Sequence, residues 1–208
     1  GSWGKPKMDH LLTIIGDKLN HAAVHVRFGV PMENELTRTF YNNRPGRKYT
    51  PQFFLNEQAS TTLTADGFLD STATFDKAIQ FANEAYGASV PLLDGVVTKE
   101  GNQLKVKYGV QSNMGGLDGY NLAAYLLTSG LQYLQKGFRG SNPIHNNVIV
   151  SSADEQYGVP VQTTANTFER EAIFDITALE GEPSILIVLW QKEGQYHFSS
   201  NSLRLEVE

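Results

Sequence analysis

The sequence contains no cysteine at any of its 208 positions. This absence excludes disulfide bonds, a thiolate nucleophile, cysteine-bound zinc and iron–sulfur clusters within the chain. It does not decide the cellular compartment, because many exported proteins also lack cysteine. Long apolar runs are absent too: a membrane-spanning helix needs about 18 apolar residues. The longest run here, Ile185–Trp190, has the length of a β-strand.

Basic residues are also scarce. The chain has 17 Lys and Arg against 22 Asp and Glu, which gives a net charge of −5. A general nucleic-acid binder needs a basic face that neutralises phosphates, and the densest basic stretch, residues 44–48 (RPGRK), is short and typical of a solvated turn. We therefore expect no nucleic-acid partner. The hydrophobic share of 40% and charged share of 19% are those of a folded globular protein.

The two halves of the chain have different hydrophobic periodicities. The first half, residues 1–87, alternates helical stripes with short apolar runs, which predicts an α/β unit. The second half, residues 88–208, has a period of two and turns rich in Gly, Asn and Pro, which predicts an antiparallel β-sandwich. The predicted fold class is therefore α+β, with one domain over 1–87 and another over 88–208. The expected helices are 7–19, 32–41 and 71–86; the expected strands are 22–30, 49–56, 90–97, 103–110, 121–127, 146–151, 170–177, 184–191 and 201–207.

Three patterns invite a catalytic or metal-binding interpretation and do not sustain it. His21 and His25 have the spacing of a zinc-binding helix, but they lie in an expected strand and the glutamate of that motif is missing. The glycine-rich stretch 115–119 lacks the lysine of a phosphate loop and precedes a strand. Carboxylates such as Asp154 and Glu155 form no marked pair for glycoside hydrolysis. We predict no catalytic residue, no cofactor and no metal.

Loops of the expected sandwich carry the better candidates for ligand binding. Asn146 beside His145 precedes a strand, where such side chains either bind a ligand or cap a turn. Exposed aromatic rings suit carbohydrate binding, since a flat ring covers one face of a sugar. The ring candidates are Tyr120, Tyr125, Tyr133, Phe138, Tyr157 and Tyr196. The predicted ligand-binding loops are 110–121, 135–147 and 152–160, with Asp118, Tyr120, His145, Asn146 and Tyr157 as candidate contacts.

Two features together suggest a family. Residues 2–6 (SWGKP) precede the first expected helix, where a thioredoxin carries Cys-x-x-Cys-Pro, and Pro51 opens a strand as the thioredoxin cis-proline does. The second half resembles the β-rich part of the Omp28-like outer-membrane-associated proteins of Bacteroidetes. The resembling stretches are 122–127 (LAAYLL), 130–135 (GLQYLQ), 145–148 (HNNV), 157–158 (YG), 187–190 (IVLW) and 201–207 (NSLRLEV).

The resemblance implies a truncated thioredoxin-like unit that lacks its first strand, and an exported protein of the periplasm or outer-membrane surface that is often lipid-anchored. Ser2 and Lys5 stand where the two cysteines would be, and neither can exchange disulfides. A vestigial groove around Trp3, Lys5 and Pro51 is then a second candidate binding surface.

The expected role is that of a non-enzymatic, redox-inactive binding or scaffolding protein of the cell envelope, whose partner is an envelope protein or a glycan. Three alternatives stay open. One is a thiol–disulfide protein whose cysteines were mutated or trimmed, which the native gene sequence around Ser2 would decide. Another is a glycan-binding module. A third is an oligomer that exchanges strands between chains, because a missing strand leaves backbone groups unpaired along a sheet.

Overall fold

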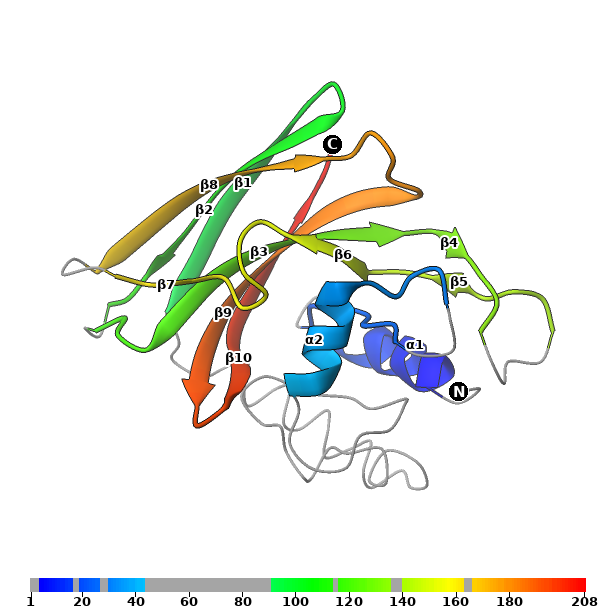
Figure 1. The fold of residues 1–208 in the computed structure, drawn as a ribbon, viewed down its shortest axis with the longest axis horizontal. Coiled ribbons are helices and arrows are strands. Elements are labelled where there is room, and N and C mark those ends of the chain that lie inside the picture. Colours follow the sequence, from blue (N-terminus) through cyan, green and yellow to red (C-terminus); the bar gives the residue numbers. More distant parts are fainter. Residues whose placement is uncertain are drawn as a thin grey trace.

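Two antiparallel β-sheets form the body of the protein in the computed structural model, which describes residues 4–16, 19–26, 30–43, 91–113, 116–135, 140–162 and 166–208 (Figure 1). One sheet has the strand order β1-β2-β8. The other has the order β10-β9-β3-β6, and β7 also pairs with β3; β4 and β5 pair separately. The strands are β1 (Leu92–Glu100), β2 (Gln103–Gln111), β3 (Tyr120–Ser129), β4 (Leu131–Gln132), β5 (Ile144–His145), β6 (Val148–Ser152), β7 (Val159–Pro160), β8 (Thr167–Asp175), β9 (Glu182–Glu193) and β10 (Tyr196–Glu206).

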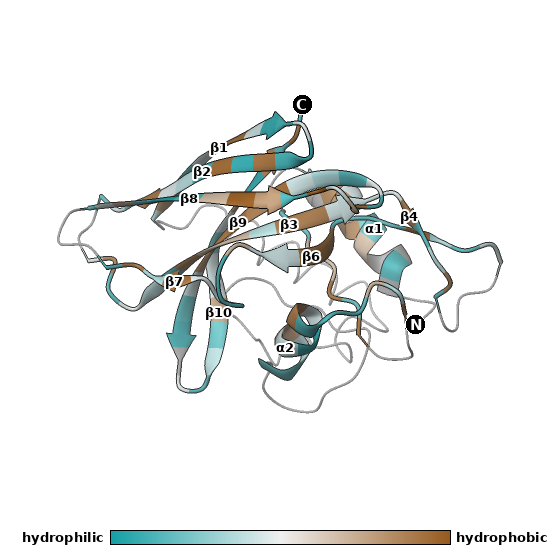
Figure 2. Ribbon diagram, turned by 45° about the horizontal axis from the view of Figure 1, so that its top comes forward, coloured by the Kyte–Doolittle hydropathy of each residue, from teal (hydrophilic) through white to brown (hydrophobic). Residues whose placement is uncertain are grey.

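The main core lies between the two sheets. Strand β2 contributes every second residue to it, because its other face is exposed to solvent. Strands β3 and β9 are buried on both faces, so their sequences read as continuous apolar runs rather than as alternation (Figure 2). The main buried core residues are Leu104, Val106, Tyr108, Val110, Leu117, Leu122, Ala124, Leu126, Val161, Phe174, Ile185, Ile187 and Leu189.

The predicted sandwich is confirmed, and its turn chemistry explains the first hairpin. Glu100 pairs with Gln103, so only Gly101 and Asn102 form the turn between β1 and β2. Gly101 has a φ of 59°, the left-handed conformation that two-residue hairpin turns require. Each strand expected between residues 90 and 207 has a counterpart in the structure, although its bounds differ by a few residues.

A third layer covers the outer face of the five-stranded sheet (Figure 1). It consists of the described parts of residues 4–43, which include α1 (Gly4–Ile15) and α2 (Glu35–Asn43). Leu36 and Phe40 of α2, together with Ala22, pack against the apolar residues that β3 and β9 present on this side. This cover is the reason why β3 and β9 can be apolar on both faces.

A side-chain cap marks the start of α2, and a left-handed glycine marks the end of α1. Asn34 precedes α2; its Oδ1 accepts a hydrogen bond from the Thr37 backbone N–H at 2.8 Å, and its own N–H donates to Thr37 Oγ1 at 3.0 Å. This reciprocal pair gives hydrogen-bond partners to two backbone N–H groups at the start of the helix, those of Asn34 and Thr37. Helix α1 is followed by Gly16 at a φ of 61°, a left-handed residue that terminates helices. The expected continuation of this helix to residue 19 is therefore wrong.

The prediction of a thioredoxin-like α/β unit, and with it the α+β class, is also wrong. In the described part of residues 4–43 the expected strand 22–30 is replaced by one isolated parallel bridge, between Ala23 and Val148 of β6. The apolar residues of this segment bury themselves against the sandwich, so they need no sheet of their own. The fold is β-rich, with two helices among the described residues.

Several predictions about the first half lie outside the described residues. These are the strand 49–56, the helix 71–86, and the domain boundary between residues 87 and 88, which stays a prediction. Neither described helix is long and apolar enough to cross a membrane.

Candidate binding surface

The structure divides the five predicted loop residues between the two ends of β3. Asp118, Tyr120 and Tyr157 lie near the first residues of that strand, where β7 pairs with it. His145 and Asn146 lie near its last residues, where the Asn146 Oδ1 accepts a hydrogen bond from the Gly130 N–H at 3.0 Å. A strand of this length spans about 30 Å, so the five residues form two separate groups.

The groove predicted around Trp3, Lys5 and Pro51 stays untested. Trp3 and Pro51 lie outside the described residues. Lys5 lies in the first turn of α1, and its Nζ is 2.6 Å from Oδ2 of Asp9, one helical turn further on. This partly exposed pair is a helix-surface contact of modest strength.

Histidines occupy the junction between the N-terminal segment and β6. The rings of His25 and His145 meet edge to face, with centroids 4.9 Å apart. The pKa of His21 and of His25 is lowered to about 4, mainly by burial, and for His25 the charges of His145 and His21 contribute to this lowering. Burial also lowers the pKa of His145, whose Nε2 lies 3.0 Å from the carbonyl oxygen of Tyr133.

These histidines help to hold the N-terminal segment in place. Asn147 adopts a left-handed φ of 56°, its carbonyl accepts the Ala23 N–H at 2.7 Å, and its side chain contacts His21 and Arg204. Among the described residues no group of three His, Asp or Glu side chains could hold a metal ion. The geometry around Asn147 makes these neutral imidazoles part of a buried polar attachment.

Asp154 also has a structural partner. Its Oδ1 lies 2.7 Å from Nη2 of Arg170, which belongs to the other sheet, and its Oδ2 accepts a weaker hydrogen bond of 3.4 Å from the hydroxyl of Tyr108. Burial raises the pKa of Tyr108 to about 12, and the negative charge of Asp154 adds to this effect. This carboxylate links the sheets from within.

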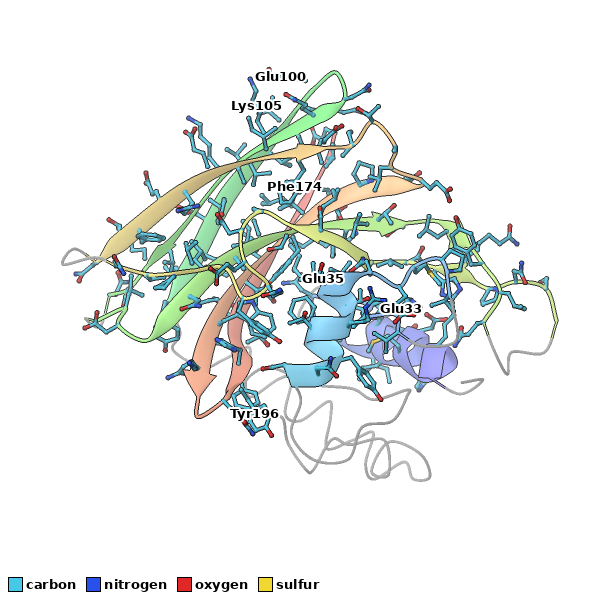
Figure 3. The ribbon with its side chains drawn as sticks, in the orientation of Figure 1. Glu33, Glu35, Glu100, Lys105, Phe174 and Tyr196 are labelled. Atoms are coloured by element: carbon cyan, nitrogen blue, oxygen red, sulfur yellow. The ribbon has the colours of Figure 1, made fainter. Side chains whose placement is uncertain are left out.

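Aromatic rings gather at the end of the sandwich where β9 turns into β10. We call this group the aromatic end. The tip of this hairpin extends two residue pairs beyond the last pairing of β9 with β3, and Figure 3 labels Tyr196 at the tip. Gly194, at a φ of 59°, lies in the turn. The aromatic end consists of Tyr120, Tyr157, Trp190, Tyr196, His197 and Phe198.

On the outer face of the sheet the rings satisfy one another. Tyr157 stacks on His197 with centroids 4.1 Å apart and meets Trp190 edge to face at 5.1 Å. The Trp190 Nε1–H donates to the Tyr125 hydroxyl at 2.7 Å, and that hydroxyl donates to the Gln156 carbonyl at 2.6 Å. Tyr125 is fully buried, so its candidacy as an exposed ring is wrong. This face is the packing surface for Phe40 of α2 rather than an open platform.

Two polar atoms on this face, the Tyr157 hydroxyl and His197 Nδ1, are buried and find no hydrogen-bond partner in the described part of the chain. Burial raises the pKa of Tyr157 and lowers that of His197, so both side chains are uncharged near neutral pH. Asn43, the last residue of α2, forms two hydrogen bonds with the His197 backbone, at 2.9 and 3.0 Å. The end of α2 is thereby attached to the edge strand β10.

On the inner face the aromatic rings are half-buried. Tyr120 of β3 pairs with Gln191 of β9, and Gln191 pairs with Phe198 of β10. Paired residues of neighbouring strands share a face, so the three side chains form one row. Tyr196 lies beside Phe198, with ring centroids 6.4 Å apart. Both rings are half-buried, and the Gln191 side chain is exposed.

Sequence reasoning selected some of these residues and missed others. Tyr120, Tyr157 and Tyr196 were among the ring candidates, whereas Phe138 lies outside the described residues. Tyr133 is half-buried against the cluster of Met32, Leu131 and Val148, and its hydroxyl donates to Glu180. Gln191 and Phe198 were missed, because only the strand register reveals that they flank each other.

Comparison with known proteins supports the fold. No protein-family model matches the sequence, and no curated protein matches it. Among solved structures, HBP35 of Porphyromonas gingivalis matches with a TM-score of 0.79 at 13% identity, over 98% of this chain and 69% of that one. The two chains share a fold. At this identity the likeness to HBP35 shows the architecture alone, and it extends over the N-terminal segment as well as the sandwich.

Proposed function

We propose that the protein is an exported, non-enzymatic binding or scaffolding protein of the cell envelope, and that it binds through the aromatic end. The observation that carries this proposal is the group of aromatic rings at the projecting hairpin of β9 and β10, whose tip carries Tyr196 (Figure 3). Half-exposed rings with free polar neighbours are typical of binding surfaces. The carboxylate of Asp154, by contrast, is held in a structural ion pair.

The shared fold with HBP35 of Porphyromonas gingivalis supports the envelope location. The Omp28-like relationship and a lipid anchor remain predictions, since no family model matches. The thiol–disulfide alternative loses its structural basis, because the described first half lacks the thioredoxin-like sheet on which it depended.

Localisation tests the proposal most directly. We expect an antibody against the native protein to find it in the envelope or periplasmic fraction of the organism that encodes it. Protease treatment of intact cells then distinguishes a surface location from a periplasmic one. Recovery of the native protein in the cytoplasmic fraction, with a cytoplasmic marker, would contradict the proposal.

A further inference from the structure

We propose that the inner face of the aromatic end binds a neutral pyranose unit of a glycan, on the row formed by Tyr120, Gln191 and Phe198. This inference deepens the proposed function and rests on it. The three residues come from three neighbouring strands in direct register. Their side chains therefore form a ring–amide–ring arrangement across the sheet.

The spacing of the row suits a single sugar ring. Neighbouring strands lie about 4.8 Å apart, so the backbones that carry the two aromatic rings are about 10 Å apart. This backbone separation matches the width of one six-membered sugar ring laid across the row at Gln191. Tyr196 extends the apolar surface beyond Phe198 along β10.

The chemistry of the row also matches a sugar. One face of a pyranose presents C–H groups, which pack on half-buried aromatic rings, while its edge presents hydroxyls that need hydrogen-bond partners. The exposed Gln191 amide makes no hydrogen bond with the described residues, so it can both donate to and accept from a hydroxyl. The aromatic rings thus contact the C–H face of the sugar, and the Gln191 amide contacts its hydroxyl groups.

The charge near the row favours a neutral sugar over an acidic one. Asp118, an exposed residue two positions before Tyr120, makes no ion pair among the described residues. Its carboxylate can accept further hydroxyl protons, and it repels sulfated or uronic-acid units. Lys192, the nearest cation on β9, lies on the opposite face, because consecutive residues of a strand point to opposite faces.

A glycan array followed by calorimetry tests the proposal. The complete chain is applied to neutral and acidic glycans of plant, algal and bacterial origin, and the best neutral oligosaccharide is then titrated. We expect Phe198→Ala and Gln191→Ala each to weaken binding about tenfold, the scale of one lost ring contact or hydrogen bond. Phe198→Trp, which keeps a ring, should bind within about threefold of the parent protein.

Lys192→Ala is the matched control, because it lies next to Gln191 in sequence but on the other face, and it should leave the affinity unchanged. Circular dichroism and thermal melting confirm that each variant folds. An array without any bound glycan, binding of acidic glycans alone, or equal affinity of the two row variants and the control would overturn the sugar site. None of these results affects the localisation experiment, so failure of the sugar site can be distinguished from failure of the proposed envelope function.

Discussion

At the scale of single residues, close backbone approaches place strict limits on side chains. Gly158 has a φ of 71°, and a Cβ on it would lie 2.1 Å from the carbonyl oxygen of Leu122. Gly194, in the turn of the β9–β10 hairpin, has a similar φ of 59° but no heavy atom within 4 Å of such a Cβ. A side chain at Gly194 would therefore cause conformational strain alone, whereas a side chain at Gly158 would cause the same strain and a steric overlap.

We expect Gly158→Ala to lower the free energy of unfolding by about 3 kcal/mol, which combines left-handed strain with overpacking against β3. Gly194→Ala should cost about 1 kcal/mol, from strain alone. Urea denaturation of both variants measures the difference. Equal losses would show that the backbone of Tyr157 and Gly158 moves away from β3 without cost.

The buried histidines make the stability depend on pH. The pKa of His21 and of His25 is about 4 in the folded protein and about 6.5 when unfolded. The unfolded chain therefore binds more protons between these values, and the free energy of unfolding falls as the pH drops from about 6.5 to 4, by about 1.4 kcal/mol per pH unit for each histidine. Above pH 6.5 their contribution is constant.

The charges that face His21 modify this effect in both directions, since Asp9 favours its protonated form while Arg204 and Lys5 oppose it. Denaturation at several pH values between 7.5 and 4.5 would measure the slope. His25→Asn should reduce the change of the unfolding free energy with pH by the contribution of one histidine, about 1.4 kcal/mol per pH unit. An unchanged slope would mean that His25 is accessible to solvent.

At the scale of elements, the sequence predicted the sandwich strands better than the N-terminal segment. Alternation in β2 and the apolar run in β9 depend on local burial, so a single sequence reveals them. The segment 21–26 carries the β-branched pattern of a strand, but a ladder needs a neighbour in register, and only Ala23 finds one. That outcome depends on residues far away in the sequence.

The candidate site was predictable only in part for a related reason. Rings can be identified from sequence, but their grouping depends on the register of β9 with β10. The register shifts between Ser199 and Asn201, where an extra residue bulges. Phe198 and His197 exchange faces if that bulge is ignored. No pattern in the sequence marks this position.

The ion pair between Asp154 and Arg170 connects one sheet to the other. Their side chains are 21% and 33% exposed, whereas Lys107 and Glu171, on the outer face, are 72% and 73% exposed. We expect Asp154→Ala to cost about 1–2 kcal/mol, because it leaves a partly buried guanidinium without its carboxylate. Glu171→Ala should cost less than about 0.5 kcal/mol. Thermal unfolding of both variants tests the contrast, and equal effects would place the Asp154 pair in solvent.

At the scale of the whole molecule, the open edge of the three-stranded sheet bears on the predicted strand exchange. Among the strands that the structure describes, β8 pairs only with β2. Suppose that two copies joined antiparallel along β8, with inner residues opposite inner residues and outer residues opposite outer residues. In the registers centred on residues 169–171, at least one of Glu169, Arg170 and Glu171 would then lie opposite the same or a like-charged residue of the other copy. Charges of this kind protect natural edge strands from association. Pairing between identical β8 edges is therefore disfavoured.

We expect Glu169→Thr combined with Glu171→Thr to increase self-association, because it removes the repulsion and leaves Ile173 (61% exposed) on the same strand. Light scattering across a range of protein concentrations measures the effect. Thr98→Ala, on the far strand β1, serves as the control. If the double variant associates no more than the control, something other than charge protects this edge.

The attachment of the N-terminal segment to β6 also sets an order of assembly. His21 and Asn147 are separated by 126 residues, and Asn43 and His197 by 154. Contacts over such distances form late, since the intervening chain must first be ordered. The described part of residues 19–43 therefore has no complete docking surface until β10 has been synthesised and paired with β9. During that interval His21 and His25 are exposed to water and can be protonated near their ordinary pKa of about 6.5, so acidity encountered before docking delays the last step of folding.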